Sequence, residues 1–300
     1  MSINLFLHLS KLTIAIFIFQ SVLLYGLKFI GLYDHPNHRK IHIDPKLTGG
    51  GLLFILSWIF FSGFGGVLNN LYLFIAFIVI ILLGFFDDIK MFSAKIKLII
   101  HSLTGFLMFL GNGGFTEFFG IENNIVLCIV TIIYYVSFIN IVNLIDGADG
   151  LAVIICSIIL IGVIILGINY VFAFDIILLV LSLLVFLVWN IKNSVIFMGD
   201  CGSNFLGFII AFYILKTGFS VFSYNLFIPF IFLIFLPFID TLLAIIRRLK
   251  NKKSIFAPDK EHIHHILIKK FGLNRALIIL STVQLLFTSI SLIILRGNLW

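Results

Sequence analysis

The sequence has few charged residues. Only 11% of its 300 residues are Asp, Glu, Lys or Arg, and 61% are hydrophobic, whereas about 25% of the residues of a soluble globular domain are charged. The mean hydropathy of +1.22 also excludes a soluble domain. The three cysteines, Cys128, Cys156 and Cys201, form no C-x-x-C pair, so they indicate neither a disulfide framework nor a zinc site. No small-residue cleavage site follows the first hydrophobic run, which predicts a retained helix and not a signal peptide.

Long apolar runs recur along the whole chain. A helix that crosses a bilayer needs roughly 17–25 apolar residues, and on this basis we predict one integral membrane domain over residues 1–300. The predicted fold class is all-α, a polytopic integral membrane protein with about ten transmembrane helices. These helices are predicted near residues 3–30, 49–67, 70–86, 97–111, 124–142, 150–168, 171–190, 205–217, 226–247 and 275–295.

The basic residues are divided unevenly between the two sets of connections. Seventeen of the 20 Lys and Arg lie in or beside the odd-numbered loops, and only Lys11, Lys216 and Arg296 lie toward the other face. The positive-inside rule therefore makes the odd loops cytoplasmic and both termini extracytoplasmic. The net charge of +7 follows from this topology and is no evidence for nucleic-acid binding. Five polar clusters lie on the predicted cytoplasmic side, where we expect the active site.

The first two clusters are cationic and acidic, respectively. In GLYDHPNHRKIHIDPKLTGGG, residues 31–51, Arg39, Lys40 and His42 are candidates for phosphate contact, and a cationic loop at the lipid head groups is the alternative. In GFFDDIK, residues 84–90, Asp87 and Asp88 end the third span. They suit separate tasks because adjacent side chains on a helix point in different directions. A solvated helix end is the alternative, although basic residues are the electrostatically favoured ones at a helix C-terminus.

The third cluster is NIVNLIDGADGLA, residues 140–152. Four polar residues recur there at every third position: Asn140, Asn143, Asp146 and Asp149. This spacing stacks them on one side of a helix, but Gly147 and Gly150 indicate that the helix soon breaks. Such oxygen ligands suit Mg²⁺, which typically binds one or two carboxylates, water and substrate phosphates. A structural turn is the alternative.

The fourth and fifth clusters are FMGDCGSNFLGF, residues 197–208, and APDKEHIHHILIKK, residues 257–270. Backbone N–H groups of a glycine-rich turn at a helix start bind anions, and Asp200 in such a turn suits a cation that bridges to phosphate. Zinc is disfavoured at the histidines, because no cysteine accompanies them and adjacent ligands aim poorly at one metal. Phosphate or nucleotide binding is favoured there.

Together these segments resemble the polyprenyl-phosphate N-acetylhexosamine-1-phosphate transferases of glycosyltransferase family 4. The strings YDHPNHRKIH, FFDDIK, NIVNLIDGADGLA, FMGDCGSNFLGF and PDKEHIHH occur in that family's order along nearly the whole chain. PNHRK and the H-x-H-H ending resemble the undecaprenyl-phosphate GlcNAc-1-phosphate transferase-like branch. PKLTGGG differs from the T-P-T-M-G-G type stretch of the phospho-MurNAc-pentapeptide transferases, which remain an alternative. A transporter or lipid-binding protein is a further alternative, although transporters place polar sites near the membrane midplane.

The resemblance implies an Mg²⁺-dependent glycosyl-1-phosphate transferase of the bacterial plasma (inner) membrane. Such an enzyme transfers an N-acetylhexosamine 1-phosphate from a UDP-sugar to undecaprenyl phosphate and releases UMP. The donor is expected to be UDP-GlcNAc or a related sugar such as UDP-FucNAc or UDP-QuiNAc, and the product to initiate an O-antigen or another cell-envelope glycan. Mn²⁺ is expected to substitute for Mg²⁺, membrane lipids surround the chain, and a homodimer is left open.

The resemblance also implies roles for individual residues. The catalytic residues would be Asp87, Asp88 and Asp200, and the metal ligands Asp200 and Asn143. The substrate-binding residues would be Arg39, Lys97, Asp146, Asp149, Phe197, His262, His264 and His265, with Phe197 stacked on uracil. A phosphate monoester has a second pKa of about 6, so the lipid phosphate needs little activation near pH 7. We therefore favour a single displacement, in which Asp87 orients the lipid phosphate or takes its residual proton and Asp88 supports the metal or a cationic partner.

Overall fold

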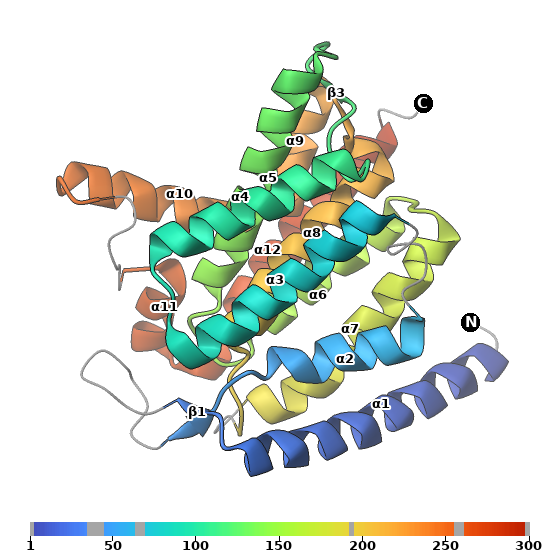
Figure 1. The fold of residues 1–300 in the computed structure, drawn as a ribbon, viewed down its shortest axis with the longest axis vertical. Helices are drawn as coiled ribbons and strands as arrows, with labels where there is room; N and C mark the ends of the chain where they lie inside the picture. Colours follow the sequence, from blue (N-terminus) through green and yellow to red (C-terminus); the bar gives the residue numbers. More distant parts are fainter. Residues whose placement is uncertain (1–2, 35–44, 64–69, 192–194, 255–260, 298–300) are drawn as a thin grey trace.

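The structure is a computed structural model that describes residues 3–34, 45–63, 70–191, 195–254 and 261–297, and these are almost entirely helical (Figure 1). The α-helices are α1 (Ile3–Ile30), α2 (Gly51–Ser62), α3 (Leu71–Lys90), α4 (Ala94–Leu110), α5 (Asn124–Ile145), α6 (Leu151–Ile165), α7 (Tyr170–Asn190), α8 (Gly199–Ile214), α9 (Tyr224–Leu233), α10 (Phe235–Lys250), α11 (Ile263–Phe271) and α12 (Leu273–Gly297). A π-helical turn, Leu215–Phe219, extends α8.

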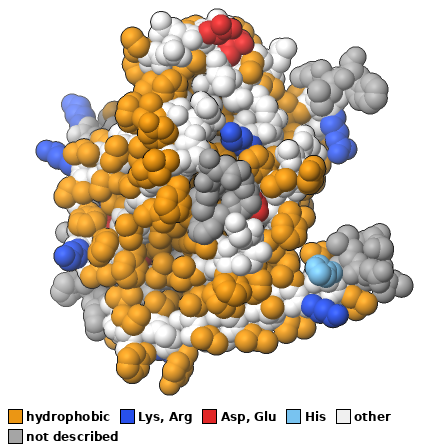
Figure 2. Space-filling model, turned by 45° about the vertical axis from the view of Figure 1, so that its right-hand side comes forward, with side chains coloured by type: hydrophobic (Ala, Val, Ile, Leu, Met, Phe, Trp, Pro, Cys, Tyr) orange, Lys and Arg blue, Asp and Glu red, His pale blue; other side chains and the backbone are white. Residues whose placement is uncertain are grey.

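Helices occupy the predicted apolar runs, so the all-α prediction is confirmed. Within the described residues, six helices are long and apolar enough to cross a membrane, or seven if α9 and α10 form one bent span. Helices α2 and α6 are apolar but shorter. The predicted number of ten spans and the side of the membrane that each end faces therefore stay predictions. Hydrophobic side chains cover most of the face shown in Figure 2, and charged ones are few and separated, as the low charge content predicts.

Helix α8 forms the centre of the molecule. Its residues from Cys201 to Ile214 are all buried, and it packs against α2, α3 and α5. Glycines allow a close approach at its N-terminal end, because a Cβ at Gly84 of α3 would overlap Cys201, and a Cβ at Gly51 of α2 would overlap Gly202. The start of α8 is therefore fixed against two neighbouring helices.

The predicted single helix over residues 226–247 is wrong in one respect. Helices α9 and α10 meet at an angle of 91°, and α10 extends away from the body of the molecule (Figure 1). Pro237 lies in the first turn of α10 and cannot continue a helix from α9, because it lacks an N–H group and its ring would meet the carbonyl of Leu233. The buried Gln284 of α12 satisfies the break, since it donates to Leu233 O at 2.9 Å and accepts from Leu236 N at 3.0 Å.

The helices alternate in direction, so the polar clusters gather at one end of the bundle. Helices α3 and α5 end there, and α4, α6 and α8 begin there. The antiparallel strands β1 (Tyr33–Asp34) and β2 (Lys46–Leu47) lie at the same end. At the opposite end, β3 (Glu117–Phe118) pairs in parallel with β4 (Val221–Phe222). The polar clusters thus lie at one end of the bundle and the β3–β4 pair at the other. The chain termini lie toward the end away from β1 (Figure 1).

Candidate active site

Two carboxylates and an ammonium group meet where α3, α4 and α8 converge. Lys97 Nζ forms ion pairs with Asp87 Oδ2 and with Asp200 Oδ2, the latter at 3.0 Å. The Asp87 side chain is fully buried, whereas those of Lys97 and Asp200 are 27% and 28% exposed. The two carboxylates thus converge on one cationic centre that a polar ligand can reach through Lys97 and Asp200.

The turn between α3 and α4 sets the position of Lys97. Asp87 Oδ1 accepts the backbone N–H of Phe92 at 2.5 Å, and Met91 adopts a left-handed conformation with φ 49°. Ser93 caps α4 by accepting the Ile96 N–H at 3.4 Å. This short connection brings the first turn of α4, which carries Lys97, back beside the last turn of α3.

Asp88 occupies a different place from Asp87. Its two carboxylate oxygens accept the backbone N–H groups of Asp200 at 2.7 Å and Cys201 at 3.2 Å. Asp200 lies in the first turn of α8, not in a turn before the helix as the sequence suggested. The N–H groups that we expected to bind a substrate anion therefore already bind a carboxylate of the protein, which is favourable at a helix N-terminus.

Asn143 joins this group from the last turn of α5. Its Nδ2 donates to Asp200 Oδ1 and, at 2.9 Å, to Ser203 Oγ. Asn140, by contrast, donates to the backbone O of Val136 at 2.7 Å. The family resemblance paired Asn143 with Asp200, and the two are in contact here, but the sequence did not reveal Ser203, whose hydroxyl lies one turn after Asp200 on α8.

The loop over residues 146–150 follows directly after α5. Gly150 adopts φ 78°, so the helix breaks where the glycines indicated. Its N–H donates to Asn190 Oδ1 at 2.8 Å, and Asn190 Nδ2 donates to Ile196 O at 3.0 Å. The buried Asn190, which sequence reasoning missed, therefore ties this loop to the segment that leads into α8.

Asp146 lies in this loop among other acids. Desolvation raises the pKa of the Asp146 carboxyl, and the carboxylates of Asp200, Asp88 and Asp149 raise it further. A cation or a hydrogen-bond donor from a substrate would therefore be favourable beside Asp146.

Phe197 lies on the segment that pairs with the start of α2. Its N–H donates to Leu47 O at 2.8 Å, and its carbonyl accepts the Gly50 N–H at 3.0 Å. Lys46 Nζ lies 5.2 Å from the centre of the Phe197 ring. Hydrogen bonds to its N–H and its carbonyl thus fix the backbone of Phe197. A cation lies over one face of its ring, which is predicted to stack on uracil.

The histidine motif lies at the start of α11. His262 Nδ1 is 2.7 Å from Asp240 Oδ2, and the Ile263 N–H donates to Asp240 Oδ1 at 2.7 Å. His264 lies over the loop after α5, because a Cβ at Gly147 would overlap its Nε2. Burial, together with His265, lowers the pKa of His264 to about 4, so this imidazole is neutral at pH 7. Asp240 lies outside the five polar clusters of the sequence.

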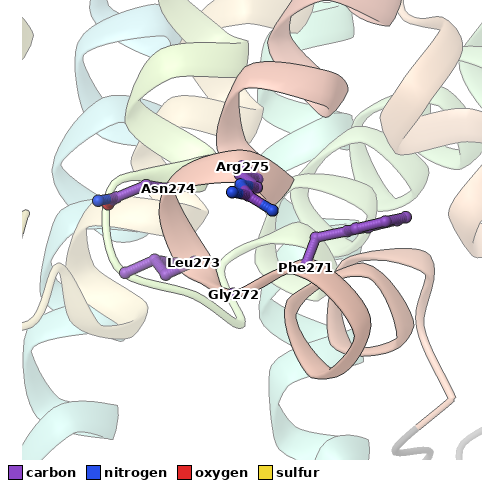
Figure 3. Close-up of a pocket in the computed structure, with 5 residues that line it drawn as sticks. All are labelled: Phe271, Gly272, Leu273, Asn274 and Arg275. Carbon is purple, nitrogen blue, oxygen red and sulfur yellow. The ribbon is translucent and has the colours of Figure 1, made fainter.

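A shallow cavity of about 420 Å³ lies elsewhere, at the turn between α11 and α12 (Figure 3). Five consecutive residues, 271–275, line it, as the close-up shows. It contains none of the predicted site residues.

Comparison with known proteins decides the family. A family model described as glycosyl transferase family 4 matches residues 70–218. A relative from Bacillus subtilis, named a probable undecaprenyl-phosphate N-acetylglucosaminyl 1-phosphate transferase, is 33% identical over 291 residues, covering 90% of this chain and 79% of the relative. The chain belongs to glycosyl transferase family 4. The family predicted from the five clusters is thus confirmed.

Two further relatives of this family 4 chain carry the name undecaprenyl-phosphate alpha-N-acetylglucosaminyl 1-phosphate transferase. The protein from Thermotoga maritima is 29% identical over 276 residues, covering 92% of this chain and 86% of the relative. The protein from Haemophilus influenzae is 31% identical over 279 residues, covering 85% and 76%. These similarities extend beyond the region that the family model matches.

In this family 4 chain, the structure brings most predicted site residues to one end of the bundle. Asp87, Lys97, Asn143 and Asp200 are in direct contact, and Asp88 reaches the same helix start through the backbone. Arg39, with Lys40 and His42, lies outside the described residues. The roles of all these residues in a reaction stay predictions.

The donors present fit the Mg²⁺ ion that the resemblance implies. Among the described residues, no three His, Cys, Asp or Glu side chains form a metal-binding group. However, Mg²⁺ usually takes only one or two carboxylates and completes its shell with water and substrate phosphates. Asp87 and Asp200 already converge on one cation, Lys97 Nζ, and Asn143 supplies an amide beside Asp200. The two carboxylates are hard oxygen donors, which suit Mg²⁺ better than zinc.

Proposed function

We propose that this chain transfers an N-acetylhexosamine 1-phosphate from a UDP-sugar to undecaprenyl phosphate and releases UMP. The observation that carries the proposal is the meeting of Asp87, Lys97 and Asp200 at one end of an apolar helix bundle. A lipid acceptor keeps its phosphate at the membrane surface, and helix ends of a polytopic protein lie at that depth. The names of the relatives support the same reaction.

The main barrier to this reaction is the repulsion between two anions, a lipid phosphate and a nucleotide diphosphate. Preorganised cations stabilise the charge that develops at such a centre. Lys97 is partly exposed and supplies one positive charge. Asp200, with Asn143 through its amide oxygen, would hold Mg²⁺, which when bound would neutralise the charge of the diphosphate oxygens.

The contacts of Asp87 favour a single displacement. An oxygen of the lipid phosphate would attack the β-phosphorus of the UDP-sugar, the bond to the bridging oxygen would break, and UMP would leave with that oxygen. A covalent route would need a free carboxylate oxygen as nucleophile. One oxygen of Asp87 accepts the Phe92 N–H and the other pairs with Lys97, while both oxygens of Asp88 accept backbone N–H groups. Asp87 is therefore better suited to hold Lys97 in place than to act as a nucleophile.

The nucleotide would bind across the loop over residues 146–150, Phe197 and the histidine motif. Phe197 offers an aromatic ring for uracil, and His262, His264 and His265 offer imidazoles for the phosphates. The proximity of His264 to Gly147 supports a shared nucleotide-binding surface formed by these two segments.

The relatives named for N-acetylglucosaminyl transfer make UDP-GlcNAc the first donor to test. The product would initiate a cell-envelope glycan such as an O-antigen at the bacterial plasma membrane, with the five clusters on the cytoplasmic face. We also propose that the chain forms a homodimer.

The test is an incubation of purified protein with undecaprenyl phosphate, Mg²⁺ and one UDP-sugar at a time, followed by mass spectrometry of the lipid. The panel includes UDP-GlcNAc, UDP-FucNAc, UDP-QuiNAc and UDP-MurNAc-pentapeptide, and the Asp200→Asn variant is the control. We expect a polyprenyl-diphospho-sugar from a simple N-acetylhexosamine donor. A product only from the pentapeptide donor, or none from any donor with folded protein, would contradict the proposal.

A further inference from the structure

The histidine motif is anchored by a buried carboxylate on a different helix. Asp240 lies in α10, six positions after the break from α9, and is 2% exposed. One of its oxygens is 2.7 Å from His262 Nδ1, and the other accepts the Ile263 N–H at 2.7 Å. Both groups lie at the first residues of α11, so one carboxylate fixes the start of that helix and one of its imidazoles.

We propose that Asp240 is a positioning residue, which accepts the Nδ1 proton of His262 and so orients the ring with Nε2 toward the phosphates of the nucleotide donor. An ionised carboxylate only accepts hydrogen bonds, so the short contact requires a proton on Nδ1. The other ring nitrogen, Nε2, donates to a phosphate oxygen when it carries a proton as well, because only the ring with two protons donates at both nitrogens. A carboxylate that orients an imidazole in this way is a recurrent device in enzyme sites.

The same anchor sets the position of His264. His264 follows two residues after His262, with the two ring centres 5.5 Å apart, and it packs on the backbone at Gly147. His264 Nδ1 lies 3.9 Å from Asp240 Oδ2, beyond hydrogen-bond distance. Asp240 therefore orients His262 directly and His264 through the start of α11. In this way it connects α10 with the loop after α5.

The break between α9 and α10 explains why this residue can reach the motif. A continuous helix would carry Asp240 straight on along the axis of α9, but the 91° bend turns α10 away. The side chain of Gln284 satisfies the backbone groups at the break. The bend and the Asp240 contacts together fold the chain after α10 back over the candidate site.

This inference rests on the proposed transfer reaction, and a double-mutant cycle tests it there. The single variants are Asp240→Asn and His262→Gln, combined in one double variant, with Asp175→Asn as a control that changes another buried carboxylate. An Asn side chain lacks the negative charge and can donate to Nδ1, so it no longer supports a ring that carries protons on both nitrogens. We expect Asp240→Asn to lower kcat/KM for the UDP-sugar about 10- to 100-fold, and Asp175→Asn to leave it unchanged.

The decisive comparison is the double variant. If Asp240 acts through His262, the double variant loses no more than the worse single variant, within about twofold to threefold. Losses that multiply, or full activity of Asp240→Asn, would overturn the proposal, because a general loss of fold would add to the loss of His262.

A second measurement uses the wild-type protein and needs neither activity nor a stable Asp240 variant. Nitrogen-15 NMR of histidine-labelled protein, with the signal assigned by His262→Gln, reports which ring nitrogen carries the proton. We expect a proton on Nδ1. A neutral ring with its proton on Nε2 would refute the Asp240 contact, whereas a wild-type protein that has the Nδ1 proton but transfers no sugar phosphate would refute only the proposed function.

Discussion

Replacing Lys97 by Met removes the positive charge on which two carboxylates converge. Lys97 contacts Asp87, whose side chain is fully buried, and Asp200 at 3.0 Å. Removal of one partner of a fully buried ion pair costs about 3–5 kcal/mol because a charge is left uncompensated, whereas an exposed pair contributes about 0–1 kcal/mol. Lys97 is 27% exposed, so we expect an intermediate loss of about 2 kcal/mol in the free energy of unfolding.

The assay compares Lys97→Met with Lys95→Met, which removes an exposed lysine from the same turn of α4. We expect Lys97→Met to lower the melting temperature of the detergent-solubilised protein by about 4 °C or more. Transfer activity should fall by at least about a hundredfold, because a donor aimed at the developing charge is lost. Equal melting temperatures and equal activities for the two variants would refute the central place of Lys97.

Four further outcomes follow from the site and its supports. Asp200→Asn should lower turnover at least about a hundredfold, and a chelator should abolish the wild-type activity until Mg²⁺ or Mn²⁺ is restored; undiminished turnover after either change would remove Asp200 from a metal site. Gly84→Ala should destabilise the protein by about 1–3 kcal/mol through overlap with Cys201, whereas Gly26→Ala, which has open space around it, should not; equal melting curves would show that α8 can shift freely. The pKa of His264 is lowered to about 4, so as the pH falls the unfolded chain takes up a proton before the folded one. The free energy of unfolding should therefore decrease by up to about 3 kcal/mol as the pH drops from about 6.5 toward 4. A His264→Gln variant with the same pH dependence of stability would contradict this role of His264. In a cysteine-free variant, a cysteine at Asn112 should react with an impermeant reagent outside intact cells and one at Asn251 should not, and the reverse labelling would overturn the predicted topology.

Hydropathy predicted the positions of the membrane-length helices well, because each of them is a continuous apolar run. It could not predict how they end. The break at Ile234 depends on Pro237 and on Gln284, which lies about 50 positions later and satisfies the freed backbone groups. Hydropathy alone did not indicate the 91° angle between α9 and α10. The proline inside the apolar run was a local signal that a helix could end there.

The candidate site was predicted in part for a similar reason. Residue types and spacing identified Asp87, Asn143 and Asp200, and helix directions bring these together at one end of the bundle. The division of labour between Asp87 and Asp88 depends on where α8 starts, because only its first N–H groups are free to bind Asp88. Asn190 holds the loop after α5, and Asp240 holds the start of α11, through contacts between distant segments. Asp240 stands out in the sequence as an acid within an apolar run, but its partners cannot be read from a local pattern.

The fate of the donor's β-phosphate tests the account most directly. Purified protein is given undecaprenyl phosphate, Mg²⁺ and UDP-GlcNAc labelled with ³²P in the phosphate attached to the sugar, and the lipid and nucleotide fractions are counted. If the chain transfers a sugar 1-phosphate, the label should enter the lipid as one equivalent of UMP appears, only when acceptor is present, and Asp200→Asn should abolish the transfer. If the lipid gains sugar while the label stays in UDP, the chain transfers a sugar without its phosphate, and the account is contradicted.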